Sequence, residues 1–206
     1  MNLLEFYKDA KKYCIEHGFS DEIDFVKNRR FKQMNAERFF MECVYVILNS
    51  GMKNQIAEGI FKKFRDSYYK SEIHIQSALR VVSHQGKNRA IKEIWMRYRH
   101  HFEQLKMLQT TDEKLEFLES LPWIGPITKY HLARNLGMDV AKPDRHLQRI
   151  ADKFNHKDVN EMCKEISEQT GDKIGVIDLI LWRVMEQTSG EMLNGVVQSE
   201  DKHRAN

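Results

Sequence analysis

The sequence has 206 residues, of which 41% are hydrophobic and 31% are charged, and its formal net charge is +3. This length suffices for one large domain or two small ones with an apolar core, and the composition is that of a soluble globular protein. No apolar run approaches the roughly 20 residues that a membrane-spanning helix needs. The first residues, MNLLEFYKDAKKYC, carry charges among their apolar positions, so we expect no secretory signal peptide and no membrane association.

The cysteine and histidine content argues against a metal centre. Cys14, Cys43 and Cys163 lie far apart, and their odd number without a CxxC pair disfavours a disulfide framework, a zinc knuckle or an iron–sulfur cluster. Cys43 lies in an apolar helical run and is expected to be a small buried residue. The nine histidines are scattered without an HExxH motif, so we expect no metal ligands.

The predicted elements in the first half of the chain are helices. Residues 36–50 are apolar nearly all round, which predicts a helix in the middle of a bundle. Residues 53–66 follow with an apolar face expected at Ile56, Ile60, Phe61 and Phe64. Residues 87–105 repeat the same periodicity.

The middle of the sequence predicts two helices joined by a tight turn. Thr110 and Glu113 have the spacing of a capping box, which opens the first helix. That helix stops at the segment 121–125, LPWIG. Pro126 suits the first position of a second helix, because its missing N–H is no loss there. Gly137 is a suitable left-handed terminator for that helix.

The start of this second helix is predicted to be an anion-binding site. We expect its N-terminal amides, those of Ile127 and Thr128, to be exposed beside Lys129. A helix N-terminus carries partial positive charge and unpaired donors, so it can hold a phosphate without reading sequence. The alternative is an ordinary helical hairpin that packs its ends together, and the hairpin taken alone favours that alternative.

A Pro-Asp pair precedes the next predicted helix, which carries Leu147, Ile150 and Phe154 at helical spacing. Asp144 would cap this helix at Arg145, a normal role for Asp after Pro. Five apolar residues between 179 and 184 predict a second well-buried helix near the C-terminus. No alternating strand pattern appears, so the predicted fold class is all-α.

Two linked motifs resemble a known family. LPWIGPITKYHLARNLG followed by VAKPDRHLQRIA is similar to the helix-hairpin-helix DNA glycosylases, the superfamily of endonuclease III, the MutY adenine glycosylase and AlkA. Their pattern is LPGxGxxTA, an amphipathic helix, and an Asp before a short helix. ECVYVILNSGMKNQIAEGIFKKF and GKNRAIKEIW resemble the helices that precede the hairpin, so the resemblance covers roughly residues 36–185. No cluster of four cysteines follows residue 185, which matches the members without an iron–sulfur cluster.

The resemblance implies two helical lobes with DNA crossing a cleft between them. One lobe is expected to be a helical barrel over 36–137 that contains the hairpin, and the other to combine 1–35 with 138–190. Residues 191–206, which are largely polar, are expected to form a mobile tail. The implied partner is double-stranded DNA with a damaged or mismatched base, bound by a monomer. The expected location is therefore the cytoplasm, associated with the nucleoid, or the nucleus.

The resemblance also implies an activity, the base-excision repair reaction in which the N-glycosidic bond of a flipped base is hydrolysed. Its transition state has oxocarbenium character, which an ionised carboxylate near C1′ stabilises while it helps to activate water. By resemblance, this carboxylate is Asp144. Capping and catalysis are compatible, because a cap fixes the position of the side chain.

The position of the family's Schiff-base lysine, two residues after the second hairpin glycine, is Ile127 in this sequence. Lys129 is rotated from it by about 200° around the helix. We therefore expect a monofunctional glycosylase with water as the nucleophile. The alternatives are a bifunctional glycosylase and lyase that uses Lys129, and a non-catalytic DNA-binding protein that has kept the hairpin.

The remaining predicted site residues also follow from the resemblance. Ile127 and His131 share a helix face and are expected to line the base pocket, although packing of His131 against neighbouring helices is an equal alternative. The residues expected to bind DNA are Trp123, Gly125, Ile127, Thr128 and Lys129. Trp123 stands in place of the first hairpin glycine, so the turn is expected either to change shape or to pack the indole along the DNA.

Extrusion of a base leaves a gap in the duplex that must be filled. Asn49, Met52 and Gln55 are candidates for this role, with a simple helix cap around Asn49 as the alternative. Lys87, Asn88 and Arg89 are expected to hold another phosphate or to lie at a solvated helix start.

No cofactor is expected from the side chains. By resemblance, a monovalent cation at the hairpin would bind backbone carbonyls around Leu121, Trp123 and Ile124.

Overall fold

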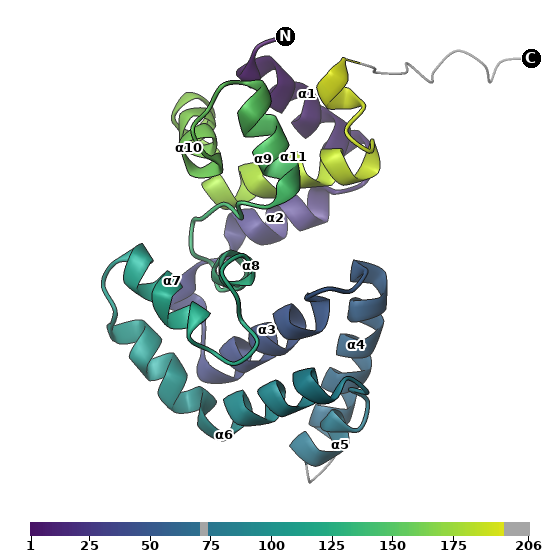
Figure 1. Cartoon of the computed structure of the whole chain (residues 1–206), viewed down its shortest axis with the longest axis vertical. Helices are drawn as coiled ribbons and strands as arrows, with labels where there is room; N and C mark the ends of the chain where they lie inside the picture. The colour runs from purple at the N-terminus through teal and green to yellow at the C-terminus, as the bar shows by residue number, and fades with distance from the viewer. Residues whose placement is uncertain (71–73, 196–206) are drawn as a thin grey trace, which may run out of the picture. The chain divides into compact units, whose positions relative to one another are not determined.

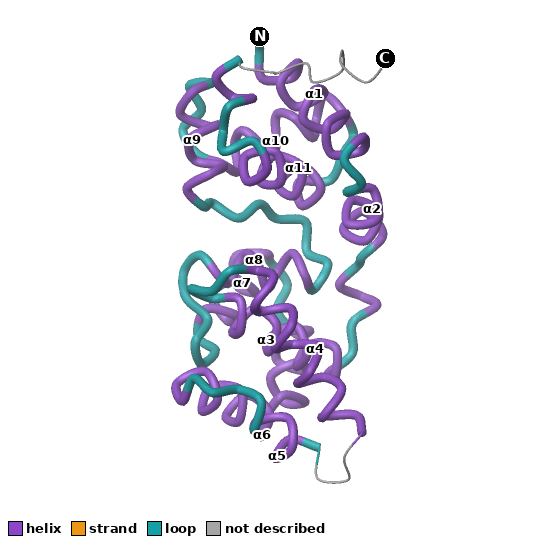
Figure 2. The backbone as a smooth tube through the Cα atoms, turned by 90° about the vertical axis from the view of Figure 1, so that its right-hand side faces the viewer, coloured by secondary structure: helices purple, strands orange, loops and turns teal. Residues whose placement is uncertain are grey.

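The computed structural model describes residues 1–70 and 74–195 and consists, in this part of the chain, of eleven α-helices and two short 3-10 helices without any strand. Figures 1 and 2 show these helices joined by loops. The predicted all-α fold class is confirmed. None of the described helices is long and apolar enough to cross a membrane.

The chain divides into two compact units, which we call the hairpin unit and the terminal unit. The hairpin unit spans Arg29–Met138, and the terminal unit combines Met1–Asn28 with the chain from Asp139 onward. The helices of the hairpin unit are α3 Ala36–Asn49, α4 Asn54–Lys70, α5 Ile75–Leu79, α6 Gln85–Met107, α7 Thr111–Glu119 and α8 Thr128–Asn135, after the 3-10 helix Phe31–Gln33. The helices of the terminal unit are α1 Leu3–Glu16, α2 Ser20–Asn28, α9 Arg145–Lys153, α10 Val159–Thr170 and α11 Ile174–Gln187, before the 3-10 helix Met192–Asn194.

Helix α3 forms the core of the hairpin unit and packs against α4, α6 and α8 (Figure 1). Eight of its side chains are buried, as its apolar sequence predicts: Phe39, Phe40, Met41, Cys43, Val44, Val46, Ile47 and Leu48. The predicted face of α4 is partly wrong, since Ile56 is 54% exposed. The buried residues of α4 are Ala57, Phe64 and Tyr68, and Ala57 lies about 100° around the helix from Ile56.

The segment before α3 belongs to the hairpin unit, which therefore begins earlier than the predicted boundary at residue 36. Arg29 forms an ion pair with Glu42 of α3, and the ring of Phe31 lies 6.3 Å from that of Phe102 in α6. These contacts are made by side chains whose partners lie far along the chain, so local periodicity does not reveal them.

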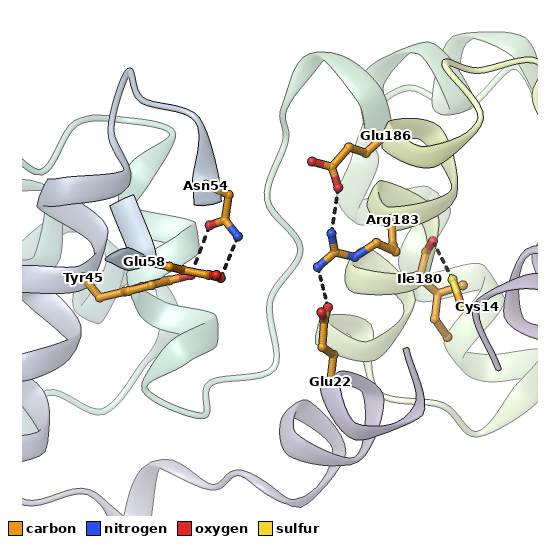
Figure 3. A network of polar contacts seen from close by, with 8 residues as sticks. All are labelled: Cys14, Glu22, Tyr45, Asn54, Glu58, Ile180, Arg183 and Glu186. Carbon is orange, nitrogen blue, oxygen red and sulfur yellow. Dashed lines mark hydrogen bonds and ion pairs between the residues drawn. The ribbon is translucent and has the colours of Figure 1, made fainter. Parts of the chain in front are cut away.

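Helix α11 is the buried helix of the terminal unit and is surrounded by α1, α2, α9 and α10. Arg183 of α11 pairs with two carboxylates, those of Glu22 in α2 and Glu186, at 2.5 and 2.7 Å (Figure 3). Cys14 and Cys163 are buried in this unit and Cys43 in the hairpin unit, all three as free thiols.

The predicted mobile tail, residues 191–206, includes residues that pack against the core of the terminal unit. Met192 and Leu193 are only 7% and 3% exposed, and Lys153 donates to the carbonyl of Leu193. Two apolar side chains at these positions bury themselves against the core although the surrounding sequence is polar. Residues 196–206 of the predicted tail lie outside the described residues.

Gly137 ends α8 in the left-handed conformation, with φ +84°, as predicted. The amide of Met138 donates back to the carbonyl of Ala133 at 3.0 Å, which closes the Schellman motif typical of such an end. A Cβ at residue 137 would lie 2.6 Å from the backbone of Arg30. A glycine at residue 137 therefore allows both the left-handed end of α8 and the close approach of the backbone at Arg30.

We predict that Gly137→Ala lowers the free energy of unfolding by at least about 2 kcal/mol, since it adds a backbone clash to left-handed strain. Gly171→Ala is the matched control, because Gly171 ends α10 at φ +72° and a Cβ added to it would meet nothing within 4 Å. That control is expected to lose only about 1 kcal/mol. Chemical denaturation measures both, and equal losses would contradict the close approach.

Candidate functional site

The first helix of the hairpin opens as its sequence predicts. The hydroxyl of Thr110 accepts from the Glu113 amide at 3.2 Å, and the Glu113 carboxylate accepts from the Thr110 amide at 2.8 Å. This reciprocal capping box begins α7. The helix ends at Glu119, and the turn that follows is closed by a bond from the Ile124 amide to the Leu121 carbonyl at 3.1 Å.

Trp123 adopts the backbone conformation that a glycine would adopt at this place in the turn, with φ +69°. A side chain in this region costs about 1–2 kcal/mol. The indole nitrogen donates to the hydroxyl of Ser50 at 3.0 Å, and the ring lies edge-on to His84 at 5.3 Å. The indole packs on the protein while 42% of the residue stays exposed.

The second helix begins later than predicted, at Thr128 instead of Pro126. The physical reason is the Thr128 hydroxyl, which accepts from the Gly125 amide at 2.7 Å and fixes the chain in a turn before the helix starts. The Lys129 amide then donates to the Gly125 carbonyl at 3.0 Å. The Gly125 amide is thus satisfied inside the protein and is not free to bind a phosphate.

Two amides remain for an anion at this helix start. Within the described part of the chain, the amides of Ile127 and Thr128 donate to no protein acceptor. Ile127 is 41% exposed, so solvent reaches this end of the helix. A helix N-terminus with free donors attracts a phosphate through hydrogen bonds and through the helix dipole.

The Lys129 side chain is held in an ion pair with Glu119. Its ammonium lies 2.5 Å from the carboxylate of Glu119 and 5.5 Å from the centre of the Tyr130 ring. The hydrogen bond to Glu119 raises the pKa of the Lys129 amine above its usual range. An amine must lose its proton before it can attack carbon, so this environment opposes a nucleophilic role.

His131 packs against α3. Its ring lies edge-on to the ring of Tyr45, with 5.9 Å between the centroids. The hydroxyl of Tyr45 donates to Asn54 at 3.2 Å, and the Asn54 amide donates to Glu58 at 2.7 Å (Figure 3). Burial raises the pKa of Tyr45, so its hydroxyl keeps the proton that it donates. His131 therefore packs against a neighbouring helix, which is the alternative given for it above. The ring that it contacts there is that of Tyr45.

The loop between α3 and α4 is shorter than the segment that contains the candidate gap-filling residues Asn49, Met52 and Gln55. Helix α3 ends at Asn49 and α4 begins at Asn54, so the loop is Ser50–Lys53. Gln55 lies in the first turn of α4, outside the loop, because the helix starts at the preceding residue. Met52 is half-buried in the loop. The side-chain nitrogen of Asn49 is buried.

Lys87 holds the start of this loop and is neither a phosphate ligand nor a solvated residue. Its ammonium donates to the carbonyls of Leu48 and Ser50, both at 2.7 Å, and the residue is only 4% exposed. Burial lowers the pKa of this amine. Sequence reasoning missed this role, since the acceptors are backbone atoms nearly 40 positions earlier in the chain.

Asp144 lies in the terminal unit at the start of α9, which it caps as predicted. One carboxylate oxygen accepts from the amides of His146 and Leu147, at 2.9 and 3.2 Å. The other oxygen lies 3.5 Å from the ammonium of Lys142, and the Asp144 side chain is 12% exposed. The two amides fix one oxygen as an acceptor, and the ammonium of Lys142 forms an ion pair with the other.

Comparison with known proteins shows the fold. The 8-oxoguanine glycosylase/lyase of Methanocaldococcus jannaschii, in complex with a 15mer DNA containing 8-oxoguanine, is similar at a TM-score of 0.66 and 21% identity, covering 91% of this chain and 98% of that chain. The 8-oxoguanine DNA glycosylase of Thermotoga maritima is similar at a TM-score of 0.66 and 20% identity, covering 90% and 98%. No protein-family model and no curated protein matches the sequence. The chain therefore has the fold of these glycosylases over nearly its whole length.

We predict that Asp144→Ala lowers the free energy of unfolding by about 1 kcal/mol through loss of the cap, and that Asp144→Ser retains most of it. Asp158→Ala is the matched control, because Asp158 caps α10 with the same pair of bonds, at 2.8 and 2.9 Å. Thermal or chemical denaturation measures these changes. No loss in Asp144→Ala beside a normal loss in Asp158→Ala would contradict the capping geometry.

Proposed function

We propose that this protein is a DNA glycosylase that removes a damaged base from double-stranded DNA by hydrolysis. The observation that carries the proposal is the carboxylate of Asp144, fixed by two backbone amides and the Lys142 ammonium. A cap alone requires one oxygen, and here the second oxygen is also oriented by a cation. The fold likeness to DNA glycosylases supports this assignment.

In the proposed reaction, the amides of Ile127 and Thr128 bind a backbone phosphate and position the strand. The bond between C1′ and the base nitrogen breaks, and its electrons leave with the base. The negative charge of Asp144 stabilises the cationic sugar, and water then adds to C1′. The hydroxyl stays on the sugar and the proton of the water is transferred to the departing base, so a free base and an abasic site result.

Water is the proposed nucleophile because no suitable amine stands at the hairpin among the residues that the structure describes. Ile127 has no nitrogen in its side chain, and Lys129 is paired with Glu119. This differs from the lyase activity given for the Methanocaldococcus jannaschii enzyme, whose fold the chain shares. The proposed activity is therefore monofunctional.

The first substrate to test is 8-oxoguanine, the lesion that both similar enzymes act on. The proposed base pocket contains Ile127 and His131, with the ring of Tyr45 behind His131. An apolar side chain and two flat rings suit contact with a purine. The proposed gap-filling residues are Met52 in the Ser50–Lys53 loop and Asn49, the last residue of α3 before it.

A monovalent cation at the hairpin is also proposed from the family resemblance. Of the three carbonyls concerned, that of Leu121 already accepts a bond from the Ile124 amide. The carbonyls of Trp123 and Ile124 accept no backbone hydrogen bond within the described residues, so these two fit a cation. The cation would help to hold a phosphate, and no step of the reaction runs through it.

We predict that Asp144→Asn lowers base release by at least about 100-fold, since the amide keeps an oxygen for the cap but loses the negative charge. Release is measured on a panel of lesion-containing duplexes, beginning with 8-oxoguanine, as strand cleavage after alkali treatment. Asp158→Asn serves as the control and is expected to retain full activity. An Asp144→Asn protein that releases base at the wild-type rate would overturn the catalytic assignment.

Borohydride trapping is predicted to separate the monofunctional from the bifunctional mechanism. Wild type and Lys129→Ala are expected to form no covalent complex with lesion or abasic DNA. Ile127→Lys is expected to form one, because it places an amine at the position of the family's Schiff-base lysine. A wild-type complex that disappears in Lys129→Ala would contradict the proposal and establish Lys129 as the nucleophile.

A further inference from the structure

Trp123 is an unusual residue for a left-handed turn, and its indole makes three contacts that a glycine could not make. The ring nitrogen donates to the Ser50 hydroxyl at 3.0 Å, and the ring meets His84 edge-on at 5.3 Å. The far edge of the ring lies over Gly86, where a Cβ would stand only 2.6 Å from it. Gly86 therefore provides the space in which the indole fits.

The same loop is held a second time by Lys87. Ser50 offers its hydroxyl to Trp123 and its carbonyl to the Lys87 ammonium, at 3.0 and 2.7 Å. Lys87 and Gly86 are neighbours in the first turn of α6. Ser50 thus contacts both the hairpin turn and the start of α6.

We propose that Trp123 is a positioning residue that couples the hairpin turn to the Ser50–Lys53 loop, so that phosphate binding at the turn and gap filling by the loop occur together. The inference rests on the proposed function, since gap filling presupposes an extruded base. A glycine at residue 123 would form the turn at lower energetic cost, but it would remove the contact between the turn and Ser50. The strain at Trp123 is retained because its side chain makes this connection.

The physical consequence is that the coupling matters most for base-paired substrates. When the damaged base is paired, its extrusion leaves a gap and also leaves the opposite base without a partner. A loop already held in place fills this gap without a further loss of conformational freedom. When the lesion lies opposite an abasic site, no pairing with an opposite base has to be broken. Loosening the loop should therefore slow release from paired duplex and leave release from the unpaired lesion nearly unchanged.

The test uses two variants that disturb the indole without touching the proposed catalytic residues. Gly86→Ala places a methyl group where the indole lies, and Ser50→Ala removes the acceptor of its N–H. Gly59→Ala is the matched control, because Gly59 is also a helical glycine but has nothing within 4 Å of the added Cβ. Each full-length variant is compared with wild type by hydrogen exchange and by single-turnover base release.

We expect the amides of Ser50 and Met52 to exchange about five-fold faster in Gly86→Ala and Ser50→Ala than in wild type, as loss of one hydrogen bond or its packing equivalent implies. Base release should fall about five-fold on paired 8-oxoguanine and less than about two-fold on 8-oxoguanine opposite an abasic site. Affinity for undamaged duplex should not change. A general structural defect would instead lower release from both substrates.

The inference is overturned if wild type releases base and Gly86→Ala and Ser50→Ala behave like Gly59→Ala, or if both substrates slow equally. If wild type releases base from neither substrate, the proposed function itself fails and the inference fails with it. Faster exchange without any change in release would show that the contact orders the loop but does not serve base extrusion, which also contradicts the coupling.

Discussion

The first amides of an α-helix have no acceptor within the helix, and the arrangement of this protein depends on how two such helix starts are completed. At α9 the amides of His146 and Leu147 bind the side chain of Asp144. At α8 the Gly125 amide is taken by Thr128, while those of Ile127 and Thr128 remain without an acceptor in the described chain. One helix start therefore fixes a carboxylate, and the other is free to receive a phosphate oxygen. The proposed cleavage of a glycosidic bond in DNA uses both of these features.

The other end of a helix poses the opposite problem, because its last carbonyls lack donors. Helix α3 is surrounded by other helices, and the buried ammonium of Lys87 binds the carbonyls of Leu48 and Ser50 at its C-terminal end. A cation at this position is favoured by the helix dipole. By binding the carbonyl of Ser50, the Lys87 ammonium also fixes the path of the chain into the Ser50–Lys53 loop. The contact of Trp123 with Ser50 then relates this loop to the hairpin turn.

The fold class and the hairpin are readable from the sequence because they follow from local rules. The all-round apolar residues of α3, the capping box of Thr110 and Glu113, and the terminal Gly137 each act within a few positions of the chain. The Asp144 cap is local in the same sense.

What the sequence did not reveal depends on partners that are distant in the chain. The Trp123 indole contacts Ser50, the Lys87 ammonium binds carbonyls at the end of α3, and Arg29 pairs with Glu42. None of these follows from periodicity, because each partner is specified only by the packing of the complete unit. The start of α8 was misplaced for a related reason: the Thr128 hydroxyl competes for the Gly125 amide and delays the helix by two residues. The resemblance supplied the identity of Asp144 as a candidate, and the structure supplied the orientation of both of its oxygens.

The central claim is hydrolysis of a base from DNA without cleavage of the strand, and it is tested most directly by mass spectrometry of the complete reaction. The wild-type protein is incubated with a duplex that carries a single 8-oxoguanine, or another lesion of the panel, and all products are weighed without alkali treatment. The account predicts free base together with a full-length strand that has lost the base and gained one hydroxyl at C1′. Failure to detect a free base from any lesion, or a strand already cut at the lesion, would contradict it.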